Sequence, residues 1–202
     1  MAIFLNENSR VLVQGMTGSE GMKHTNRMIE SGTNIVAGVN PRKAGESVEV
    51  QGQSIPVYGT VAEAMAATGA DVSVVFVPPA FTKAAVVEAI EAAIPLCVVI
   101  TEGVPVHDTA YFYALAAKSG ATRIIGPNCM GIINNEPGFL LDASFTATRT
   151  WPGEVAMVSQ SGALGEAILA DATAAGLGVS MFASIGNRAD VTAADLIEYW
   201  EH

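Results

Sequence analysis

The chain has 202 residues, half of them hydrophobic and only 15% charged, so it is long enough and apolar enough to bury a substantial core. Its formal net charge of −10 argues against nucleic acid or an anionic membrane surface as a general partner. Two cysteines without metal-ligand spacing, no signal peptide and no apolar run near the roughly 20 residues of a membrane span favour a cytoplasmic protein without a metal site.

Short β-branched runs alternate with alanine-rich helical stretches through the first part of the chain. The predicted strands cover residues 10–14, 34–39, 72–77, 96–101 and 123–125. The predicted helices cover residues 19–31, 61–68, 81–93 and 108–119. Two short extended runs within 46–58 predict a hairpin-like excursion. Such alternation predicts right-handed βαβ units and an α/β fold with a Rossmann-like, open parallel sheet.

The pattern changes after this first domain, which we place at residues 1–133. Residues 134–153 hold Pro, Gly, Asn and Thr with few periodic apolar positions, so we predict a connector there. A second α/β unit, with two strands and two helices, occupies residues 154–202. Two strands are too few for an independent α/β domain. We therefore expect the remaining strands and helices of this domain on another chain, or in a segment that is missing because the sequence is truncated or a hybrid.

The clearest local motif is the glycine-rich loop from Gly15 to Gly21, which follows the first strand and opens the first helix. Its G-x-x-G-x-x-G spacing is neither the dinucleotide fingerprint nor a Walker A motif. Glycines permit close backbone approach, and free N–H groups at a helix N-terminus attract phosphate. Thr17 and Ser19 add hydroxyl donors. We predict a phosphate site; the alternative is a tight turn with Thr17 or Ser19 as the helix N-cap.

Adjacent cations, Arg42 and Lys43, follow the second strand, where NAD enzymes usually hold an acidic residue for the ribose diol. Five of the ten cations but only three of the twenty carboxylates lie in residues 1–45, so an anionic ligand is most favoured at this end. A phosphorylated ribose suits this loop, which leaves NADP or coenzyme A. The alternative is a solvated basic turn.

The carboxyl ends of the later strands supply further candidates, because ligands of open α/β sheets bind there. Pro78-Pro79 offers a rigid apolar wall for an adenine, and Thr101 and Glu102 offer hydrogen bonds; the alternative is ordinary strand-end turn chemistry. Asn128 and Cys129 fall at the same edge. The sequence suggests no His or Asp partner that would make Cys129 a nucleophile.

A second strand, small-residue turn and helix lies at Ser159-Gln160-Ser161-Gly162, which makes this loop another anion-cradle candidate. Residues 186–190 stand similarly after the next strand. The alternative for both loops is helix capping by Ser161 and Asp190.

Several of these segments together resemble a known family. VLVQGMTGSEGMKHT, GVNPRKAG, VFVPP, VVITEG and RIIGPNC resemble, in order, the α subunit of succinate–CoA ligase, also called succinyl-CoA synthetase, an enzyme of the tricarboxylic acid cycle. GPNCMGIIN, AMVSQSGALGEAIL and SIGNRADVTAADLIEY are more similar to the related NDP-forming acyl-CoA synthetases. The resemblance implies a CoA-binding Rossmann domain followed by a flavodoxin-like ligase domain.

The resemblance also implies individual contacts. The CoA contacts that it carries over are Thr17, Gly18, Ser19, Glu20, Lys43, Ile100, Thr101 and Glu102. Their places at the loop and strand ends add Gly15, Pro78 and Asn128 as CoA-binding candidates, and the phosphate-cradle candidates are Ser159, Ser161 and Gly162.

The sequence departs from the α-subunit pattern at three places. Glu20 stands where that pattern often has Gln, Met130 stands where it has Pro, and Gly165-Glu166 lies in the neighbourhood of its Tyr near the start of the second-domain helix. The family also phosphorylates a histidine in its second domain. None of His24, His107 and His202 has the family's setting, so we expect that histidine beyond residue 202 and no catalytic residue in this chain.

The resemblance thus implies a CoA-binding subunit or fragment of an NDP-forming acid–CoA ligase, which converts acid, CoA and NTP to acyl-CoA, NDP and phosphate. We expect a nucleotide-binding β-type partner to supply the Mg-nucleotide, and no activity from the chain alone. The acid, and ATP or GTP, stay open. The alternatives are a stand-alone CoA-binding or CoA-sensing module and an NADP-dependent oxidoreductase domain, although no Tyr-x-x-x-Lys constellation supports the latter.

Overall fold

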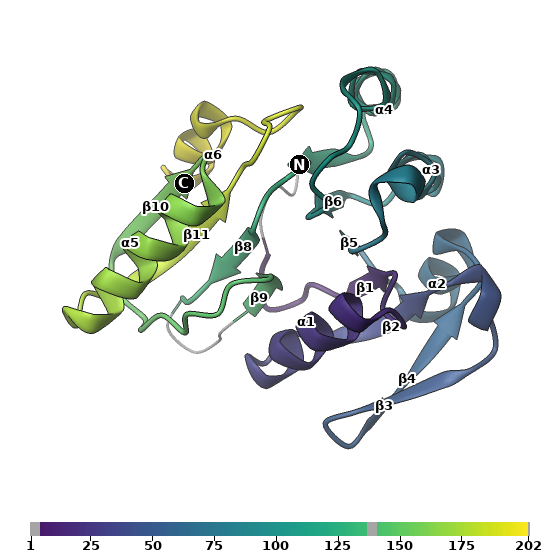
Figure 1. Cartoon of the computed structure of the whole chain (residues 1–202), viewed down its shortest axis with the longest axis horizontal. Coiled ribbons are helices and arrows are strands. Elements are labelled where there is room, and N and C mark those ends of the chain that lie inside the picture. Colours follow the sequence, from purple (N-terminus) through teal and green to yellow (C-terminus); the bar gives the residue numbers. More distant parts are fainter. Residues whose placement is uncertain (1–4, 137–140, 202) are drawn as a thin grey trace.

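A computed structural model describes residues 5–136 and 141–201 as two α/β units that lie side by side (Figure 1). The first unit contains β1 (Val11–Gln14), α1 (Ser19–Glu30), β2 (Ile35–Val39), a 3-10 helix (Pro41–Lys43), β3 (Ser47–Val50), β4 (Gln53–Tyr58), α2 (Val61–Thr68), β5 (Val72–Val75), α3 (Pro79–Glu91), β6 (Leu96–Val99), α4 (Val106–Ser119) and β7 (Arg123–Ile125). The second contains β8 (Gly131–Asn134), β9 (Leu141–Ser144), β10 (Val155–Ser159), α5 (Gly162–Ala174), β11 (Val179–Ser184) and α6 (Ala193–Trp200).

The first sheet has seven strands in the order β3-β4-β2-β1-β5-β6-β7. Strands β4, β2, β1, β5, β6 and β7 run parallel, as the alternating pattern predicts, and every residue of β1, β5 and β6 is buried. The predicted hairpin is part of this sheet rather than an excursion from it. Gln51 and Gly52, both with positive φ, make the two-residue turn between β3 and β4, and β4 pairs with β2.

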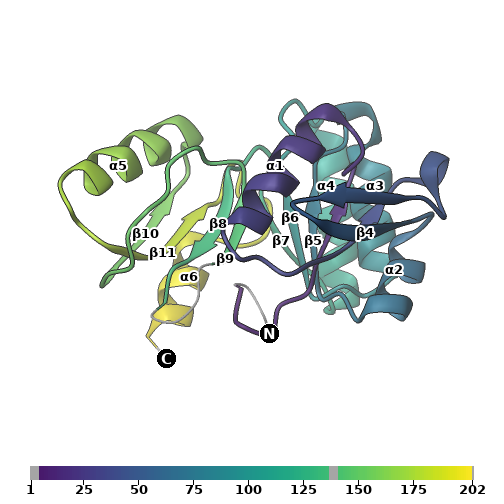
Figure 2. The same ribbon diagram turned by 90° about the horizontal axis from the view of Figure 1, so that it is seen from below.

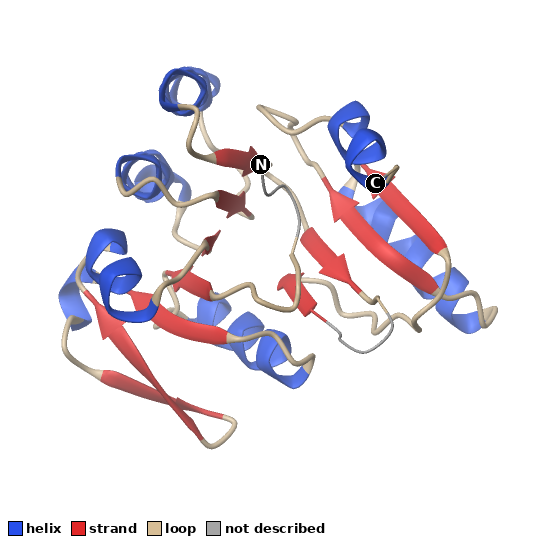
Figure 3. Cartoon of the chain, turned by 180° about the vertical axis from the view of Figure 1, so that it is seen from behind, coloured by secondary structure: helices blue, strands red, loops and turns tan. Residues whose placement is uncertain are grey.

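Helices cover the first sheet unequally. On the side away from the second sheet, α2, α3 and α4 enclose a core cluster that includes Val61, Val86 and Phe112 (Figures 1 and 3). On the other side, α1 contacts β9, and one continuous hydrophobic cluster joins Met28 of α1 to Leu141 of β9 and Leu196 of α6 (Figure 2). The two units therefore share a core.

The second sheet has the order β10-β11-β8-β9, which corrects the predicted connector. Residues 141–144, within the stretch expected to be a connector, form strand β9, and β8 (residues 131–134) pairs with β11 although most of it falls in the predicted first domain. All residues of both strands are buried. Their runs are only four residues long and include buried polar side chains, so they lack the apolar signal of a strand.

The helix starts also differ from the predicted ones. Helix α3 begins at Pro79 and α4 at Val106, each two residues before the predicted start. Proline is favoured in the first turn of a helix because its missing N–H has no intrahelical partner there. Pro79 is accordingly the first residue of α3, and Pro105 caps α4.

A ladder of backbone hydrogen bonds joins the loops of the two units. The N–H groups of Asn187, Ala189 and Val191 donate to the carbonyl oxygens of Pro127, Gly126 and Ile124 at 2.8, 3.0 and 3.1 Å, respectively. The guanidinium of Arg123 adds bonds to Asp190 and Asp195. Within the described residues, no helix is long and apolar enough to cross a membrane.

Candidate functional site

The glycine-rich loop turns directly from β1 into α1. Gly15 has a φ of +83°, and a Cβ at Gly21 would lie 2.1 Å from the carbonyl oxygen of Gly15, so the loop needs glycine at both places. The N-cap of α1 is Gly18, and no side chain hydrogen-bonds the N–H groups of the first turn. Neither Thr17 nor Ser19 caps the helix. The loop therefore leaves backbone donors free for an anion.

The basic loop after β2 is held next to this turn. The side chain of Asn40 donates to Thr17 Oγ1 at 2.6 Å and accepts from the backbone N–H of Arg42 at 3.0 Å. Lys43 is half-exposed and lies 3.5 Å from Glu46. Thus Asn40 links the glycine loop to the cations that the sequence assigns to a phosphorylated ribose.

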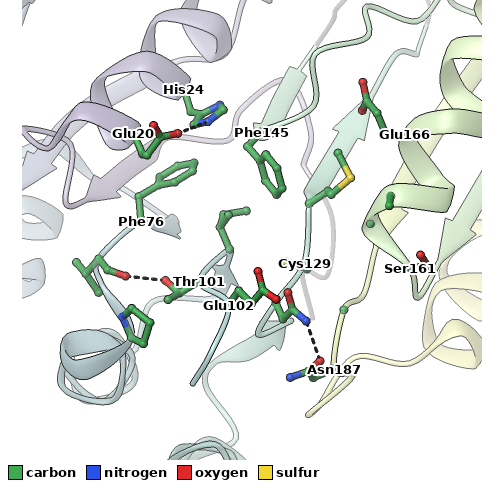
Figure 4. Close-up of a pocket in the computed structure, with 18 of the residues that line it drawn as sticks. Glu20, His24, Phe76, Thr101, Glu102, Cys129, Phe145, Ser161, Glu166 and Asn187 are labelled. Carbon is green, nitrogen blue, oxygen red and sulfur yellow. Dashed lines mark hydrogen bonds and ion pairs between the residues drawn. The ribbon is translucent and has the colours of Figure 1, made fainter. Parts of the chain in front are cut away.

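Glu20 points toward its own helix rather than into the glycine loop. Its Oε2 lies 3.3 Å from His24 Nε2 and 4.0 Å from Lys23 Nζ. His24 is buried, and burial lowers the pKa of its imidazole, with the nearby charge of Arg27 adding to the shift. His24 stacks on Phe76, with the ring centroids 5.4 Å apart (Figure 4).

A cavity of about 1150 Å³ joins the strand ends of the first sheet to the start of α5. Its first-unit wall includes Pro78 and Ile100–Glu102, and Thr101 Oγ1 donates to the carbonyl of Val77 at 2.8 Å. Asn128 has a φ of +57° and follows the cis peptide bond between Gly126 and Pro127. Its backbone N–H donates to the carbonyl oxygen of Thr101, and its side chain donates to Asn187 Oδ1 at 3.3 Å.

Cys129 lines the same cavity but is not suited to nucleophilic attack. Its thiol is buried and lies 3.2 Å from the carbonyl oxygen of Val99. Burial raises the pKa of the thiol to about 12. The side chain is therefore protonated at neutral pH.

The start of α5 forms the opposite wall. Ser161 is the N-cap, and its Oγ accepts from Leu164 N–H at 3.2 Å. Gly162 allows Met130 to pack closely, because a Cβ there would lie 2.9 Å from Met130 Cγ. Thus Ser161 caps the helix, as the alternative interpretation predicted, and both residues also line the cavity.

The structure brings only part of the predicted set together. The predicted residues that line the cavity are Glu20, Pro78, Ile100, Thr101, Glu102, Asn128, Ser161 and Gly162. The predicted residues outside that lining are Gly15, Thr17, Gly18, Ser19, Lys43 and Ser159. Ser159 instead lies in a second, apolar groove along β10 and α5. The described residues contain no group of three or more His, Cys, Asp or Glu side chains that could hold a metal ion.

Sequence reasoning did not assign His24, Phe76, Phe145 and Glu166 to the site, although all four line the cavity (Figure 4). Phe145 follows β9, a strand that the pattern did not predict. Glu166 is fixed across the cavity: its Oε1 accepts from the N–H of Ala147 at 3.3 Å and from the N–H and hydroxyl of Thr148 at 3.1 and 2.7 Å. Only the tertiary fold brings these side chains together.

The strand ends of a parallel sheet with a glycine loop share one cavity with a helix start on a second α/β sheet, an arrangement typical of two-unit nucleotide-cofactor proteins. Residues 6–103 match the CoA-binding domain, and residues 152–202 match the succinyl-CoA ligase-like flavodoxin domain. The chain belongs to the family of succinate–CoA ligase α subunits. The domain match favours coenzyme A over NADP as the ligand class of the first unit.

Similarity over nearly the whole of this chain supports this membership. The chain is 44% identical to the ADP-forming succinate–CoA ligase subunit alpha 2 of Archaeoglobus fulgidus, with 98% of this chain and 66% of that protein covered. It is 39% identical to subunit alpha 1 of the same organism, with 100% and 67% covered. The chain thus spans about two thirds of the length of these relatives.

A solved structure shows the same fold. The chain superposes on the acetyl-coenzyme A synthetase 1 of Ca. Korarchaeum cryptofilum with a TM-score of 0.82 at 27% identity. The superposition covers 96% of this chain and 42% of that protein. Both units, including the second sheet that the pattern only partly predicted, therefore occur in a larger enzyme of this superfamily.

Proposed function

We propose that this chain supplies the CoA site and part of the phosphoryl-transfer cradle of an NDP-forming acid–CoA ligase. The single observation that carries the proposal is the cavity that connects the strand ends of the CoA-binding unit to the N-terminus of α5. In this proposal CoA lies along the first wall with its thiol toward the second, because residues of both walls line the same cavity.

The first unit fits the nucleotide end of CoA. The free N–H groups at the start of α1 suit the pyrophosphate, and Lys43, on the loop tied to Thr17 through Asn40, suits the 3′-phosphate. Pro78 and Ile100–Glu102 then border the path toward the second unit. Glu20 does not oppose this assignment, because its carboxylate is held by His24.

The second unit fits the phosphoryl group. The N-terminus of α5 carries the positive end of a helix dipole, and its first residues, Ser161 and Gly162, line the cavity. The net reaction of such a ligase joins acid, CoA and NTP to give acyl-CoA, NDP and phosphate. This chain's part is to hold CoA and the phosphoryl group within reach of each other.

In this proposal the phosphorylated histidine and the Mg-nucleotide belong to parts of the ligase outside this chain. A β-type partner binds the nucleotide, and the assembly works in the cytoplasm. His24 is buried in the wall and paired with Glu20, and His107 lies at the exposed start of α4, outside the cavity lining. We therefore expect neither net ligase activity nor a phosphohistidine when the chain is incubated alone with ATP or GTP and magnesium. Labelling of His24 or His107 would contradict this assignment.

Calorimetry with CoA and dephospho-CoA tests the CoA site directly. We expect CoA to bind at least tenfold more tightly, since a hydrogen bond to a charged group contributes about 1.5–3 kcal/mol. The Lys43→Met variant should lose this difference, while Lys118→Met, on the exposed end of α4, should keep it. Equal affinity for the two ligands in the unmodified chain, or tighter binding of NADP, would overturn the proposal.

A further inference from the structure

One segment connects the helices of the two units beside the cavity. Residues 145–150, which we call the strap, follow β9 on the way to β10. Arg149 of the strap pairs with Glu30 of α1 at 3.0 Å, and Glu166 of α5 accepts hydrogen bonds from the middle of the strap. The strap is therefore bound both to the helix that follows the glycine loop and to the helix that begins at the phosphoryl cradle.

Glu166 makes the stronger of these two connections. Both partners of the ion pair between Arg149 and Glu30 are exposed, so its contribution is small. The Oε1 of Glu166 instead accepts three hydrogen bonds, from the N–H of Ala147 and from the N–H and hydroxyl of Thr148. Hydrogen bonds to a charged acceptor are stronger than neutral ones. Within the described residues neither N–H has another acceptor, so this oxygen holds the middle of the strap against α5.

Phe145, the first residue of the strap, belongs to an aromatic wall that it forms with His24 and Phe76. His24 stacks on Phe76, and the ring of Phe145 meets His24 edge-on with the centroids 5.6 Å apart (Figure 4). All three rings line the cavity. The backbone N–H of Phe145 donates to the carbonyl oxygen of Met130 at 3.0 Å, and Glu166 holds the chain two residues further on. The direction of the Phe145 ring is therefore set from both sides.

The proposed orientation of CoA brings its pantetheine arm to this aromatic wall. The glycine loop and Lys43, which suit the phosphates of CoA, lie outside the cavity lining, whereas the aromatic wall and the start of α5 belong to it. The pantetheine arm is the part of CoA between its phosphates and its thiol, and it is uncharged and largely aliphatic. Aromatic rings suit such a chain, because the contact removes apolar area from water. The phosphoryl group stays at Ser161 and Gly162, beyond the thiol.

We propose that Glu166 is a positioning residue for the pantetheine arm of CoA. Its carboxylate holds the strap so that Phe145 stays in the wall along which the arm lies, and it acts through Phe145 rather than by touching the arm. This inference rests on the proposed CoA site, since it requires the thiol to point toward α5. The adenosine end of CoA lies outside the reach of the strap, so its binding should not depend on Glu166.

Calorimetric titrations with CoA and with adenosine 3′,5′-bisphosphate, which lacks the arm, test this inference. Glu166→Leu should weaken CoA about tenfold and the bisphosphate less than twofold. Glu166→Gln keeps an acceptor oxygen for the strap and should stay within threefold of the unmodified chain for both ligands. Asp171→Leu, at an exposed position of α5 outside the cavity lining, is the control and should change neither affinity. If neither ligand binds the unmodified chain, the proposed CoA site itself is wrong. If both bind and Glu166→Leu weakens both equally or neither, the site stands and the positioning role is overturned.

A double-mutant cycle shows whether Glu166 acts through Phe145. Phe145→Ala removes the ring itself and should cause the same loss of CoA affinity, again without weakening the bisphosphate. Because Glu166→Leu then has no ring left to misplace, the double variant should bind CoA as Phe145→Ala does. Losses that multiply in the double variant would mean that Glu166 acts elsewhere, which would overturn the proposal. If Glu166→Leu does not fold, Phe145→Ala still decides, since unchanged CoA affinity in that variant would remove the wall from the site.

Discussion

The loops before α1 and α5 share one pattern, a strand followed by small residues and a helix, but they are built differently. The loop before α1 is crowded by backbone: Gly21 fits against the carbonyl of Gly15, and no side chain at the Gly18 cap accepts a hydrogen bond from the first turn of the helix. The loop before α5 is crowded by side chains, Met130 and Phe182, and Ser161 caps the helix. The first loop therefore leaves its donors to a ligand, while the second stabilises its own helix without one.

The largest effect should come from breaking the backbone contact in the first loop. Gly21→Ala places a Cβ 2.1 Å from the Gly15 oxygen, so we expect a loss of about 3 kcal/mol in the free energy of unfolding. Gly165→Ala meets a Phe182 ring that can shift, so its loss should be about 1 kcal/mol. Chemical denaturation of both variants measures the difference. Equal losses would show that the two loops are equally rigid.

Gly18→Val separates ligand approach from folding. The backbone of Gly18 is extended, and its Cβ would meet only the Gly15 oxygen, at 3.3 Å, so the fold should persist with unchanged far-UV circular dichroism. The branched side chain blocks close approach of a pyrophosphate, and we expect CoA affinity to fall about a hundredfold, or about 2.7 kcal/mol. Undiminished CoA binding by the folded variant would mean that the loop is only a turn.

The stability of the chain should depend on pH through Asp142, which lies on β9 where the two units meet. Burial on β9 raises the pKa of this carboxyl to about 6, so its contribution to stability is complete below its unfolded pKa of 3.8 and is lost as the pH rises through about 6. The free energy of unfolding of Asp142→Asn should therefore exceed that of the unmodified chain by about 3 kcal/mol at pH 8 and by little at pH 4. Asp171→Asn, on the exposed side of α5, is the control. A gain independent of pH would rule out burial of the charge as its cause.

The smallest expected change in stability comes from removing the serine side chains at the starts of α5 and α1. Ser161→Ala removes the acceptor of Leu164 N–H and should cost about 1 kcal/mol, whereas Ser19→Ala should cost almost nothing, because Ser19 caps no helix. Thermal unfolding of the two variants gives the comparison. A larger loss from Ser19→Ala would reverse the roles that we assign to the two loops.

The predictability of the two units differs for a physical reason. The strands of the first sheet are continuous apolar runs buried on both faces, and the sequence alone predicts them within about two residues. Strands β8 and β9 carry buried polar groups whose partners are remote: the Asn134 side chain donates to Leu5, and the backbone of Asp142 bonds to Thr33. No local pattern reveals such pairs.

The same reasoning applies to the candidate site. Positions 78, 100–102 and 128 could be placed at one sheet edge because the carboxyl ends of parallel strands meet there. The cluster of His24, Phe76 and Phe145 could not, because it depends on α1 packing against β9. The aromatic part of the cavity wall was therefore invisible in the sequence, whereas the apolar Pro78-Pro79 segment was predicted.

The backbone ladder between residues 124–127 and 187–191 has a mechanical consequence. The three backbone hydrogen bonds of this ladder, together with the ion pairs of Arg123, join the two units on one side of the cavity. The units cannot separate there without breaking main-chain hydrogen bonds. We therefore expect a ligand to enter at the other margin of the cavity, between Glu20 of α1 and Glu166 of α5, where Phe145 is partly exposed. If the two units move relative to each other, we expect the pivot to lie at this ladder, so that the hydrogen bond between Asn128 and Asn187 is kept.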